Sequence, residues 1–390
     1  MKVLLFNTAH RWIGEAAGTE LLARALAGAG VEVHMAVPAR GGIGGDLDRE
    51  GAPYTIHDIP WRLSKKYRRP GDPNALAQYA AARRLMRDLA PDIVHAGRGK
   101  EHWLAAFLRP VAHPRAAIVR TRHVVLPMKQ GAANRWLFRY GTDAVTAISD
   151  VAFRGLGTLG AHLPAERRRV ILGAVDTSAY RPGRRSERLR ARLGAGAEDA
   201  VLVGCLGRWQ RVKGHDVFLE AMARVLQDEP QARALVAGRK VSLKNPKLEA
   251  LHERTVVAAG VADRVAYRGT LADPAELIAS LDIGVIASRG SEGFSRIAVE
   301  YFASGVPVIA THVGALPQMV ADGETGLLVP PEDPAALAEA IGRLVCDAAQ
   351  RRRLAETARA AVAETYAPER LAREMIAVYE AALAARGSSK

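Results

Sequence analysis

Two glutamates eight residues apart, Glu292 and Glu300, bracket the start of a predicted helix. The segment 290–295 follows an apolar, strand-like run and leads into that helix. A loop in this position presents free backbone N–H groups and the positive end of a helix dipole, which together bind a phosphate group. Gly293 would let the backbone approach such a ligand closely. The pattern therefore predicts an anion site flanked by two carboxylates.

The second glutamate admits two interpretations. A carboxylate at Glu300 can accept hydrogen bonds from two neighbouring hydroxyls, such as those of a ribose or a hexose. The simpler interpretation is an ion pair with Arg296, which lies one helical turn earlier. Taken alone, the two glutamates favour the ion pair.

A second loop supports the first interpretation. In the segment 207–216, Arg208 and Lys213 again stand between a strand-like run and a helix-like stretch. Arg208 can clamp a diphosphate as a planar fork, and Lys213 can do so as a point charge. A solvated basic loop is the alternative. Two such loops in one chain predict a site for a diphosphate-linked sugar.

Short strand-like runs alternate with helix-like stretches along the whole chain, which predicts βαβ units and parallel sheets covered on both faces. The predicted strands are 3–6, 32–37, 55–59, 93–95, 117–120, 144–148, 201–206, 234–237, 265–267, 283–287, 308–310 and 326–329. The fold class is therefore α/β, with two doubly wound, Rossmann-like domains.

The alternation breaks at residues 176–199, which are rich in Gly, Pro and Arg, and then resumes. We predict an N-terminal domain over 1–180, a linker over 181–198 and a C-terminal domain over 199–365, followed by a helical tail over 366–390. Ligands of doubly wound sheets lie at the carboxyl ends of the strands, so a central cleft between the domains is the expected site.

The two cysteines, Cys205 and Cys346, exclude a disulfide scaffold and a Cys-based zinc site. Such cysteine usage is typical of a reducing compartment. The apolar run at the start of the chain is too short for a signal peptide. No stretch approaches the roughly 18 apolar residues of a membrane span. We expect a cytoplasmic protein, either soluble or attached to the inner face of the cytoplasmic membrane.

The net charge of +14 is unevenly distributed. Residues 1–180 hold 26 Lys/Arg and 15 Asp/Glu, whereas residues 181–390 hold 29 and 26. The densest basic cluster is interleaved with aromatic residues and comprises Arg62, Lys65, Lys66, Arg68 and Arg69. A patch of this kind attracts an anionic membrane surface, a nucleic acid or an anionic acceptor, although a solvated loop is equally consistent with it.

Together these motifs resemble the retaining GT-B glycosyltransferases of family 4, also called group 1 glycosyltransferases. The E-x7-E motif of that family matches Glu292 and Glu300, and its G-R-x-x-x-x-K-G loop matches Arg208 and Lys213. Further matching segments are 8–29, 91–95, 120–123, 143–149, 175–176, 305–314 and 322–330. The tail resembles the family segment that crosses back to pack on the N-terminal, acceptor-binding domain.

The resemblance implies a role for each matching residue. Glu292 would contact the transferred sugar, and His123 would lie beside that sugar at the cleft floor; these are the catalytic candidates. Glu300 would bind the ribose. The other donor-binding candidates are Arg208, Lys213, Gly293, Phe294 and Ser295 at the diphosphate, Arg268 near the base and Gly14 in the first loop. Tyr301, Gln318 and Glu15 depart from the family pattern, and these departures affect the acceptor and the exact donor rather than the fold.

The resemblance implies a bacterial, metal-independent transferase that needs no cofactor. It would move a hexose-like sugar from a nucleoside diphosphate, with UDP favoured, to a lipid-linked or cell-envelope glycan such as lipopolysaccharide core. Asp46 and Asp48 spell the D-x-D of a metal-dependent transferase, but they follow a glycine-rich run and chance is the simpler explanation. A sugar-nucleotide epimerase of the same fold is an alternative. A basic, non-enzymatic nucleic-acid-binding protein lacks any supporting motif, so no nucleic-acid partner is expected.

Overall fold

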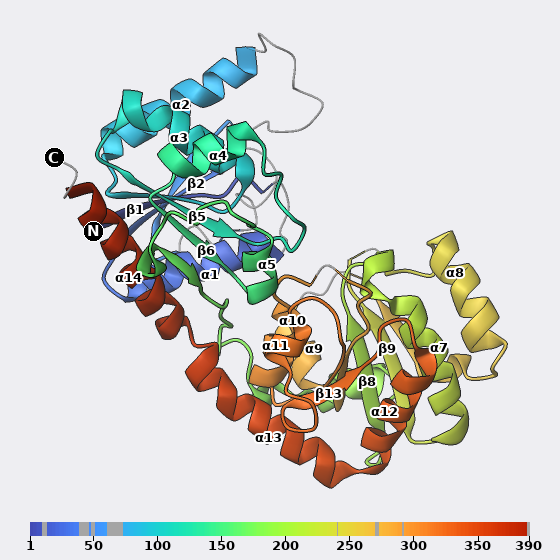
Figure 1. Cartoon of the computed structure of the whole chain (residues 1–390). Helices are drawn as coiled ribbons and strands as arrows, with labels where there is room; N and C mark the ends of the chain where they lie inside the picture. Colours follow the sequence, from blue (N-terminus) through green and yellow to red (C-terminus); the bar gives the residue numbers. More distant parts are fainter. Residues whose placement is uncertain are drawn as a thin grey trace. The chain divides into compact units, whose positions relative to one another are not determined.

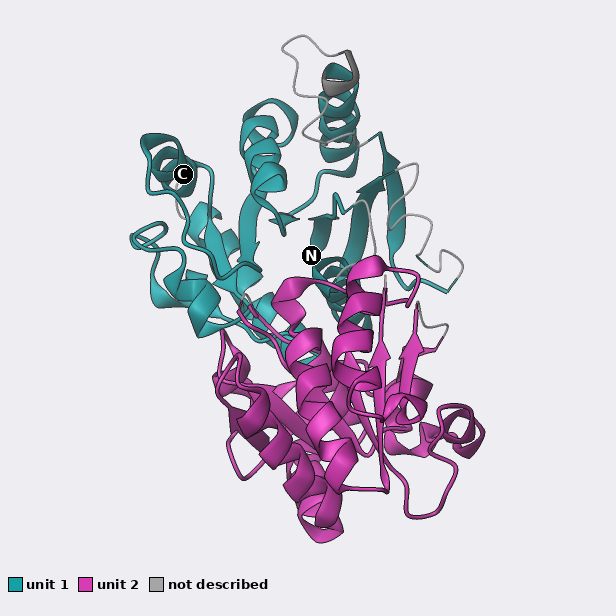
Figure 2. Cartoon of the chain, turned by 90° about the vertical axis from the view of Figure 1, so that its right-hand side faces the viewer, with its two compact units in different colours: residues 1–174, 368–390 teal, residues 175–367 magenta. Residues whose placement is uncertain are grey.

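The computed structural model describes residues 1–9, 14–38, 47, 51–60, 73–239, 241–269, 273–290 and 292–387. The chain divides into two compact units, each built on its own parallel sheet (Figures 1 and 2). Unit 1 contains residues 1–174 and 368–390, and unit 2 contains residues 175–367. The predicted class, α/β with two doubly wound domains, is confirmed.

Unit 1 has seven parallel strands in the order β3-β2-β1-β4-β5-β6-β7. Their bounds are β1 Lys2–Phe6, β2 Glu32–Pro38, β3 Thr55–Ile59, β4 Ile93–Ala96, β5 Ala117–Arg122, β6 Ala144–Ala147 and β7 Arg168–Val170. Its helices are α1 Gly14–Gly28, α2 Pro73–Leu89, α3 Gly99–Ala112, α4 Ala132–Tyr140, α5 Asp150–Arg154, the 3-10 turn η3 Ala165–Arg167 and α14 Pro368–Gly387. The strand order reverses between β1 and β4, and ligands of such sheets bind beyond a reversal of this kind.

Two layers of helices cover the sheet of unit 1, as Figure 1 shows. The core on one face joins α1 and α14 to the strands, with Leu26 and Tyr379 fully buried in it. The core on the other face joins α2, α3 and α4 through residues such as Met86, Leu104 and Leu137. The central strands are buried on both sides, which explains their continuous apolar sequences.

Unit 2 has six parallel strands in the order β10-β9-β8-β11-β12-β13. Their bounds are β8 Val201–Leu206, β9 Ala232–Ala237, β10 Val265–Arg268, β11 Ile283–Ile286, β12 Val308–Thr311 and β13 Gly326–Val329. The helices and turns are η4 Pro182–Arg184, α6 Glu187–Arg192, η5 Arg211–Lys213, α7 His215–Asp228, α8 Pro246–His252, η6 Glu253–Val257, η7 Ala262–Arg264, α9 Pro274–Ala279, α10 Arg296–Ala303, α11 Leu316–Met319, α12 Pro334–Cys346 and α13 Ala348–Thr365. Here the strand order reverses between β8 and β11.

Tyr301, the large residue where the family pattern has a small one, is fully buried in unit 2. Its ring lies over Gly284 of β11, where a Cβ atom would come within 2.7 Å of the ring. The phenol hydroxyl donates to the carbonyl of Gly204 in β8 at 3.3 Å. Gly284 therefore makes room for this ring, Gly204 accepts its hydrogen bond, and burial raises the pKa of the phenol.

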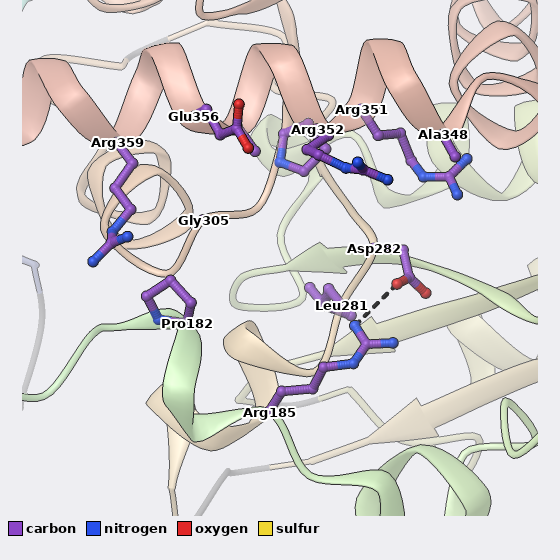
Figure 3. A pocket seen from close by; sticks show the side chains of 12 residues that line it. Pro182, Arg185, Leu281, Asp282, Gly305, Ala348, Arg351, Arg352, Glu356 and Arg359 are labelled. Atoms are coloured by element: carbon purple, nitrogen blue, oxygen red, sulfur yellow. Dashed lines mark hydrogen bonds and ion pairs between the residues drawn. The ribbon is translucent and has the colours of Figure 1, made fainter. Parts of the chain in front are cut away.

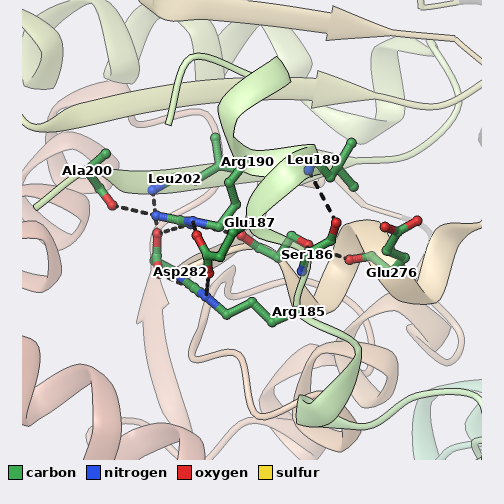
Figure 4. Close-up of polar contacts among 10 residues, drawn as sticks. Arg185, Ser186, Glu187, Leu189, Arg190, Ala200, Leu202, Glu276 and Asp282 are labelled. Carbon is green, nitrogen blue, oxygen red and sulfur yellow. Dashed lines mark hydrogen bonds and ion pairs between the residues drawn. The ribbon is translucent and has the colours of Figure 1, made fainter. Parts of the chain in front are cut away.

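The segment 181–198, for which the sequence predicts a linker, lies in unit 2 and contains η4 and α6. Arg190 of α6 is only 2% exposed. Figure 4 shows its guanidinium reaching Asp282, whose carboxylate lies 2.7 Å away, and the carbonyl of Ala200, also at 2.7 Å. The buried ion pair anchors α6 beside the start of β11, which a count of Gly, Pro and Arg residues could not indicate.

Candidate functional site

Three loops meet at the carboxyl edge of the sheet in unit 2, beyond the reversal between β8 and β11. Gly214 ends the loop after β8 with a φ of 64°, and a Cβ there would lie 1.8 Å from the carbonyl oxygen of Ala287. Gly314, after β12, has a φ of 58°, and a Cβ there would lie 2.3 Å from the carbonyl oxygen of Glu292. Only glycine fits at either position. The backbone N–H of Ala315 also donates to that Glu292 oxygen at 2.7 Å.

Glu292 and Lys213 meet at this edge. The Lys213 Nζ donates to Glu292 Oε1 at 2.6 Å, and the hydroxyl of Ser288 donates to the same oxygen at 2.6 Å. The Glu292 side chain is 6% exposed and that of Lys213 is 32% exposed. The carboxylate is therefore held in place from within the protein, while the ammonium group keeps access to a ligand. Ser288 carries no sequence signal beyond its place at the end of a strand-like run.

The start of α10 lies in the same loop system. Ser295 is the N-cap residue, and its buried hydroxyl has no hydrogen-bond partner among the described residues. Its backbone N–H donates to the sulfur of Met319 at 3.4 Å, a weak acceptor. Gly293 and Phe294 are buried or half-buried just before it, and the Phe294 ring lies 6.2 Å from that of Tyr366. The helix start thus offers donors that are poorly satisfied within the protein.

Glu300 shows both features considered from the sequence. Its carboxylate accepts from Arg296 at 3.0 Å, so the ion pair one helical turn away is present. It also takes part in a hydrogen bond with Tyr180, and burial raises its pKa despite the nearby arginine. Burial raises the pKa of Tyr180 as well, with Glu300 contributing. Tyr180 is a contact that sequence spacing could not reveal, because it lies 120 residues away.

The remaining donor candidates of unit 2, Arg208 and Arg268, follow or end strands at the same edge. Arg208 follows β8 and is exposed. Arg268 ends β10, and its guanidinium donates to the carbonyl of Arg192 at 3.1 Å, so the side chain is directed toward α6. Its own carbonyl accepts from the backbone N–H of Gly238.

His215, which the sequence did not single out as a site residue, is buried next to Lys213. Its ring lies against the loop after β8 and takes part in a hydrogen bond with the backbone of Gly207. Burial, helped by the lysine charge, lowers its pKa to about 4. The ring packs 5.3 Å from Trp209. His215 is therefore a neutral, buried group that packs inside the loop carrying Lys213.

In unit 1 a second polar group lies at the carboxyl edge, where β1, β4 and β5 end. Glu101 of α3 is buried and accepts from the N–H and hydroxyl of Thr8, both at 2.7 Å, and from the N–H groups of Gly97 and Arg98, both at 2.8 Å. It therefore fixes the loops after β1 and β4. Burial still raises its pKa.

His123, Glu15 and Glu101 surround Gly97: a Cβ on that glycine would lie 3.6 Å from His123 Nε2 and 3.5 Å from Glu15 Oε1. Burial, with Arg120 and Arg98 nearby, lowers the pKa of His123 to about 3, so the ring is neutral. Glu15 pairs with Arg98 at 2.9 Å. Gly14 is the exposed first residue of α1. The cluster Arg62 to Arg69 and the pair Asp46 and Asp48 lie outside the described residues.

A hollow of about 580 Å³ lies at the opposite edge of the unit 2 sheet (Figure 3). Asp282 and Pro307, which precede β11 and β12, line it together with Arg352 and Arg359 of α13. It is therefore separate from the loops that carry Lys213 and Glu292.

Comparisons with known proteins identify the family of the chain. Residues 14–179 match the model of Glycosyltransferase Family 4, and residues 200–347 match that of Glycosyl transferases group 1. The chain is 34% identical over 292 residues to the lipopolysaccharide core biosynthesis mannosyltransferase LpsB of Rhizobium meliloti (strain 1021), covering 73% of this chain and 78% of that protein. The chain belongs to the family 4, group 1 glycosyltransferases.

A second relative of this glycosyltransferase is the lipopolysaccharide core biosynthesis mannosyltransferase LpcC of Rhizobium leguminosarum bv. viciae, 30% identical over 85% of this chain and 86% of that protein. Among solved structures, Anabaena HepE in complex with UDP and glucose has a TM-score of 0.77 at 21% identity, covering 96% of this chain and 98% of that chain. WaaG, a glycosyltransferase involved in lipopolysaccharide biosynthesis, has a TM-score of 0.66 at 18% identity, covering 95% and 98%. Both structures share the GT-B fold with this glycosyltransferase.

Proposed function

We propose that this glycosyltransferase moves a hexose-like sugar from a nucleoside diphosphate, with UDP favoured, to a lipid-linked glycan such as lipopolysaccharide core, with retention of configuration. The observation that carries the proposal is the contact of Lys213 with Glu292 beside the start of α10. It joins a cation, a buried carboxylate and a helix start at the reversal point of the sheet, where the Ser295 N–H has only a weak sulfur acceptor. Those groups suit a diphosphate joined to a sugar.

In this proposal the positive groups act on the leaving diphosphate. Lys213 and Arg208 would neutralise the charge that develops as the glycosidic bond breaks, and the N–H groups at Gly293 to Ser295 would donate to the same oxygens. Glu300 would accept from the ribose hydroxyls, exchanging part of its pairing with Arg296. Arg268 would mark the base end of the donor.

Glu292 would orient the sugar rather than attack it. Its Oε1 already accepts two short hydrogen bonds, from Lys213 and Ser288, which fix the carboxylate and reduce its nucleophilicity. The acceptor hydroxyl would then approach from the face that the diphosphate leaves, and a phosphate oxygen would take its proton. Neutral His123, in unit 1, would contact the sugar as an uncharged hydrogen-bonding group, with Gly14 near the phosphate.

The names of the relatives support the acceptor class. LpsB and LpcC are named for lipopolysaccharide core biosynthesis, as is WaaG for lipopolysaccharide biosynthesis. HepE has been solved with UDP and with UDP-glucose. We therefore propose a nucleoside-diphosphate sugar and a glycolipid as partners, and we propose that they meet at a membrane surface.

A ligand screen followed by product analysis tests the proposal. Thermal shifts would be measured with UDP, GDP and ADP, and then with sugar derivatives of the nucleotide that binds; saturation at a hundred times Kd stabilises a protein by about 2.7 kcal/mol. Transfer to a lipopolysaccharide-core acceptor would be followed by determining the anomeric configuration of the product, with and without a chelator. An inverted product would refute retention. Isomerised sugar nucleotide formed without any acceptor would indicate an epimerase instead.

A further inference from the structure

Four aromatic side chains form one exposed surface on unit 1, which we call the aromatic surface: Trp103 and Phe107 of α3, and Trp136 and Tyr140 of α4. The Trp103 and Trp136 rings are nearly parallel, with centroids 6.1 Å apart. Phe107 lies 5.3 Å from Trp103 and 6.1 Å from Trp136, and Tyr140 lies 6.2 Å from Trp136. Phe107 is 51% exposed, Trp136 45% and Tyr140 63%.

Unit 1, which carries this surface, also holds most of the large hydrophobic side chains that are exposed in the described part of the chain. The large hydrophobic residues that are exposed within the described ranges are Met1, Leu76, Tyr79, Phe107, Val111, Val124, Leu126, Trp136, Tyr140, Leu243 and Val257. Eight of these eleven fall between residues 76 and 140 of unit 1, and only two lie in unit 2, a unit of similar size. A concentrated apolar patch on a soluble domain usually marks an interaction site.

Trp103 is half-buried against the core that α2, α3 and α4 share, whereas Phe107, Trp136 and Tyr140 are exposed. The inner face of α3 already buries Leu104 and Leu108, and that of α4 buries Leu137 and Phe138. Trp103, Phe107 and Val111 then follow at four-residue intervals along another face of α3. Each helix thus carries an additional apolar face beyond the one that packs against the sheet.

The charges around the aromatic surface have one sign. Residues 99–140 contain eight Lys/Arg and a single acidic residue, Glu101, which is buried and fully engaged with backbone donors. On α4, exposed Arg135 and Arg139 alternate with Trp136 and Tyr140. Arg109 of α3 is neutralised by Asp143 at 2.7 Å, so it adds little. The exposed charge within this segment is therefore positive.

Indole and phenol rings beside arginines fit the boundary between lipid headgroups and acyl chains, where the rings are partly buried and the guanidinium groups reach phosphates. We propose that the aromatic surface docks unit 1 on an anionic lipid bilayer. That docking delivers the enzyme to a lipid-linked acceptor rests on the proposed function. The binding of the aromatic surface to a bilayer does not depend on it. This surface is distinct from the Arg62 to Arg69 cluster, to which the sequence alone pointed.

Vesicle sedimentation with the whole chain tests the docking. Vesicles of phosphatidylethanolamine and phosphatidylglycerol are expected to bind the protein, and vesicles of pure phosphatidylcholine to bind it much less. F107A/W136A should weaken binding at least about tenfold, because two partly inserted rings are lost. R135Q/R139Q should weaken it about fivefold per charge, and less at high salt. The matched controls are L243A/V257A and R343Q/R353Q, which alter exposed apolar and basic residues of unit 2.

Tryptophan fluorescence from the aromatic surface itself distinguishes docking from a general loss of folding. In a variant with Trp12, Trp61 and Trp209 changed to Phe, the remaining tryptophans are Trp103 and Trp136. Their fluorescence should be quenched by brominated acyl chains in anionic vesicles. Equal vesicle binding by F107A/W136A and wild type would overturn the proposal. The proposal would also be overturned if the wild type formed a concentration-dependent dimer, F107A/W136A were monomeric, and neither bound vesicles. The docking variants should retain UDP binding and transfer to a water-soluble acceptor. If the proposed function is wrong, the wild type itself will lack these two activities, whatever the result of the vesicle experiment.

Discussion

Replacing Lys213 with methionine removes the cation of the candidate diphosphate site while keeping most of the side-chain volume. The lost contact is the 2.6 Å hydrogen bond from Nζ to Glu292 Oε1, and the carboxylate at the other end is almost fully buried. After the change, that carboxylate keeps the hydroxyl of Ser288 as its remaining donor among the contacts described above.

Two magnitudes follow. A hydrogen bond to a charged group contributes about 1.5–3 kcal/mol, so UDP should bind roughly 10- to 150-fold more weakly to K213M. Breaking a fully buried ion pair costs about 3–5 kcal/mol, but Lys213 is a third exposed, so the loss of unfolding free energy should be nearer 1–3 kcal/mol.

Isothermal titration of UDP, well below the melting temperature, measures the first effect, and urea unfolding measures the second. Arg211 is the matched control, because it lies in the same 3-10 turn, is exposed and carries the same charge. R211M should bind UDP within about threefold of wild type, because an exposed charge outside the Lys213–Glu292 pair is screened by water and salt. If K213M and R211M bind UDP equally well, Lys213 does not hold the diphosphate and the site assignment fails.

Three further predictions concern other buried polar groups. E300Q should reduce the preference for UDP over 2′-deoxy-UDP about tenfold, the value of one charge-assisted hydrogen bond, and an unchanged ribose preference in titrations would contradict the role. Because burial raises the pKa of Glu300, the UDP affinity of the wild type should also fall as acidification protonates this carboxylate, and E300Q should lose this pH dependence. R190M should lower the unfolding free energy by about 1–3 kcal/mol, because Asp282 loses its buried partner but keeps Arg185 at 3.0 Å and the N–H of Leu202. R188M, at an exposed position of the same helix, should change it by less than about 0.5 kcal/mol in urea unfolding, and similar losses for both would refute the argument. Burial lowers the pKa of His95, in β4, to about 3 from 6.5. Below pH 6.5 the unfolded chain therefore gains a proton that the folded chain does not, and the unfolding free energy falls by up to about 1.4 kcal/mol per pH unit. H95N should show a shallower decline in unfolding free energy between pH 6.5 and pH 5, and an identical slope would show that His95 is not neutral in the fold.

The strands of both sheets could be predicted because each is a short apolar run between helix-like stretches. The twelve predicted strands correspond to β1–β6 and β8–β13, with ends that differ by two residues or fewer. β7, Arg168–Val170, was missed because it is short and two of its three residues are arginines. The edge position of β7 removes the need for an apolar sequence.

Several members of the candidate site were beyond the reach of the sequence. Tyr180 meets Glu300, and Ser288 meets Glu292, through loops that only the folded sheet brings together. Glu101 holds the loops of unit 1 although it lies in an ordinary helical segment. No local pattern marks these residues, because their partners are set by the strand order and not by spacing.

The sequence by itself determined that the chain alternates strands and helices, and that a Glu pair and an Arg/Lys loop follow strands. Those features are local, since period, turn residues and helix starts depend on neighbours in the chain. The tertiary structure alone decided that Lys213 reaches Glu292, that Gly284 accommodates Tyr301, and that the rings of α3 and α4 stack together. The reason is that the order of the strands and the packing of each sheet bring together residues that are far apart in the chain.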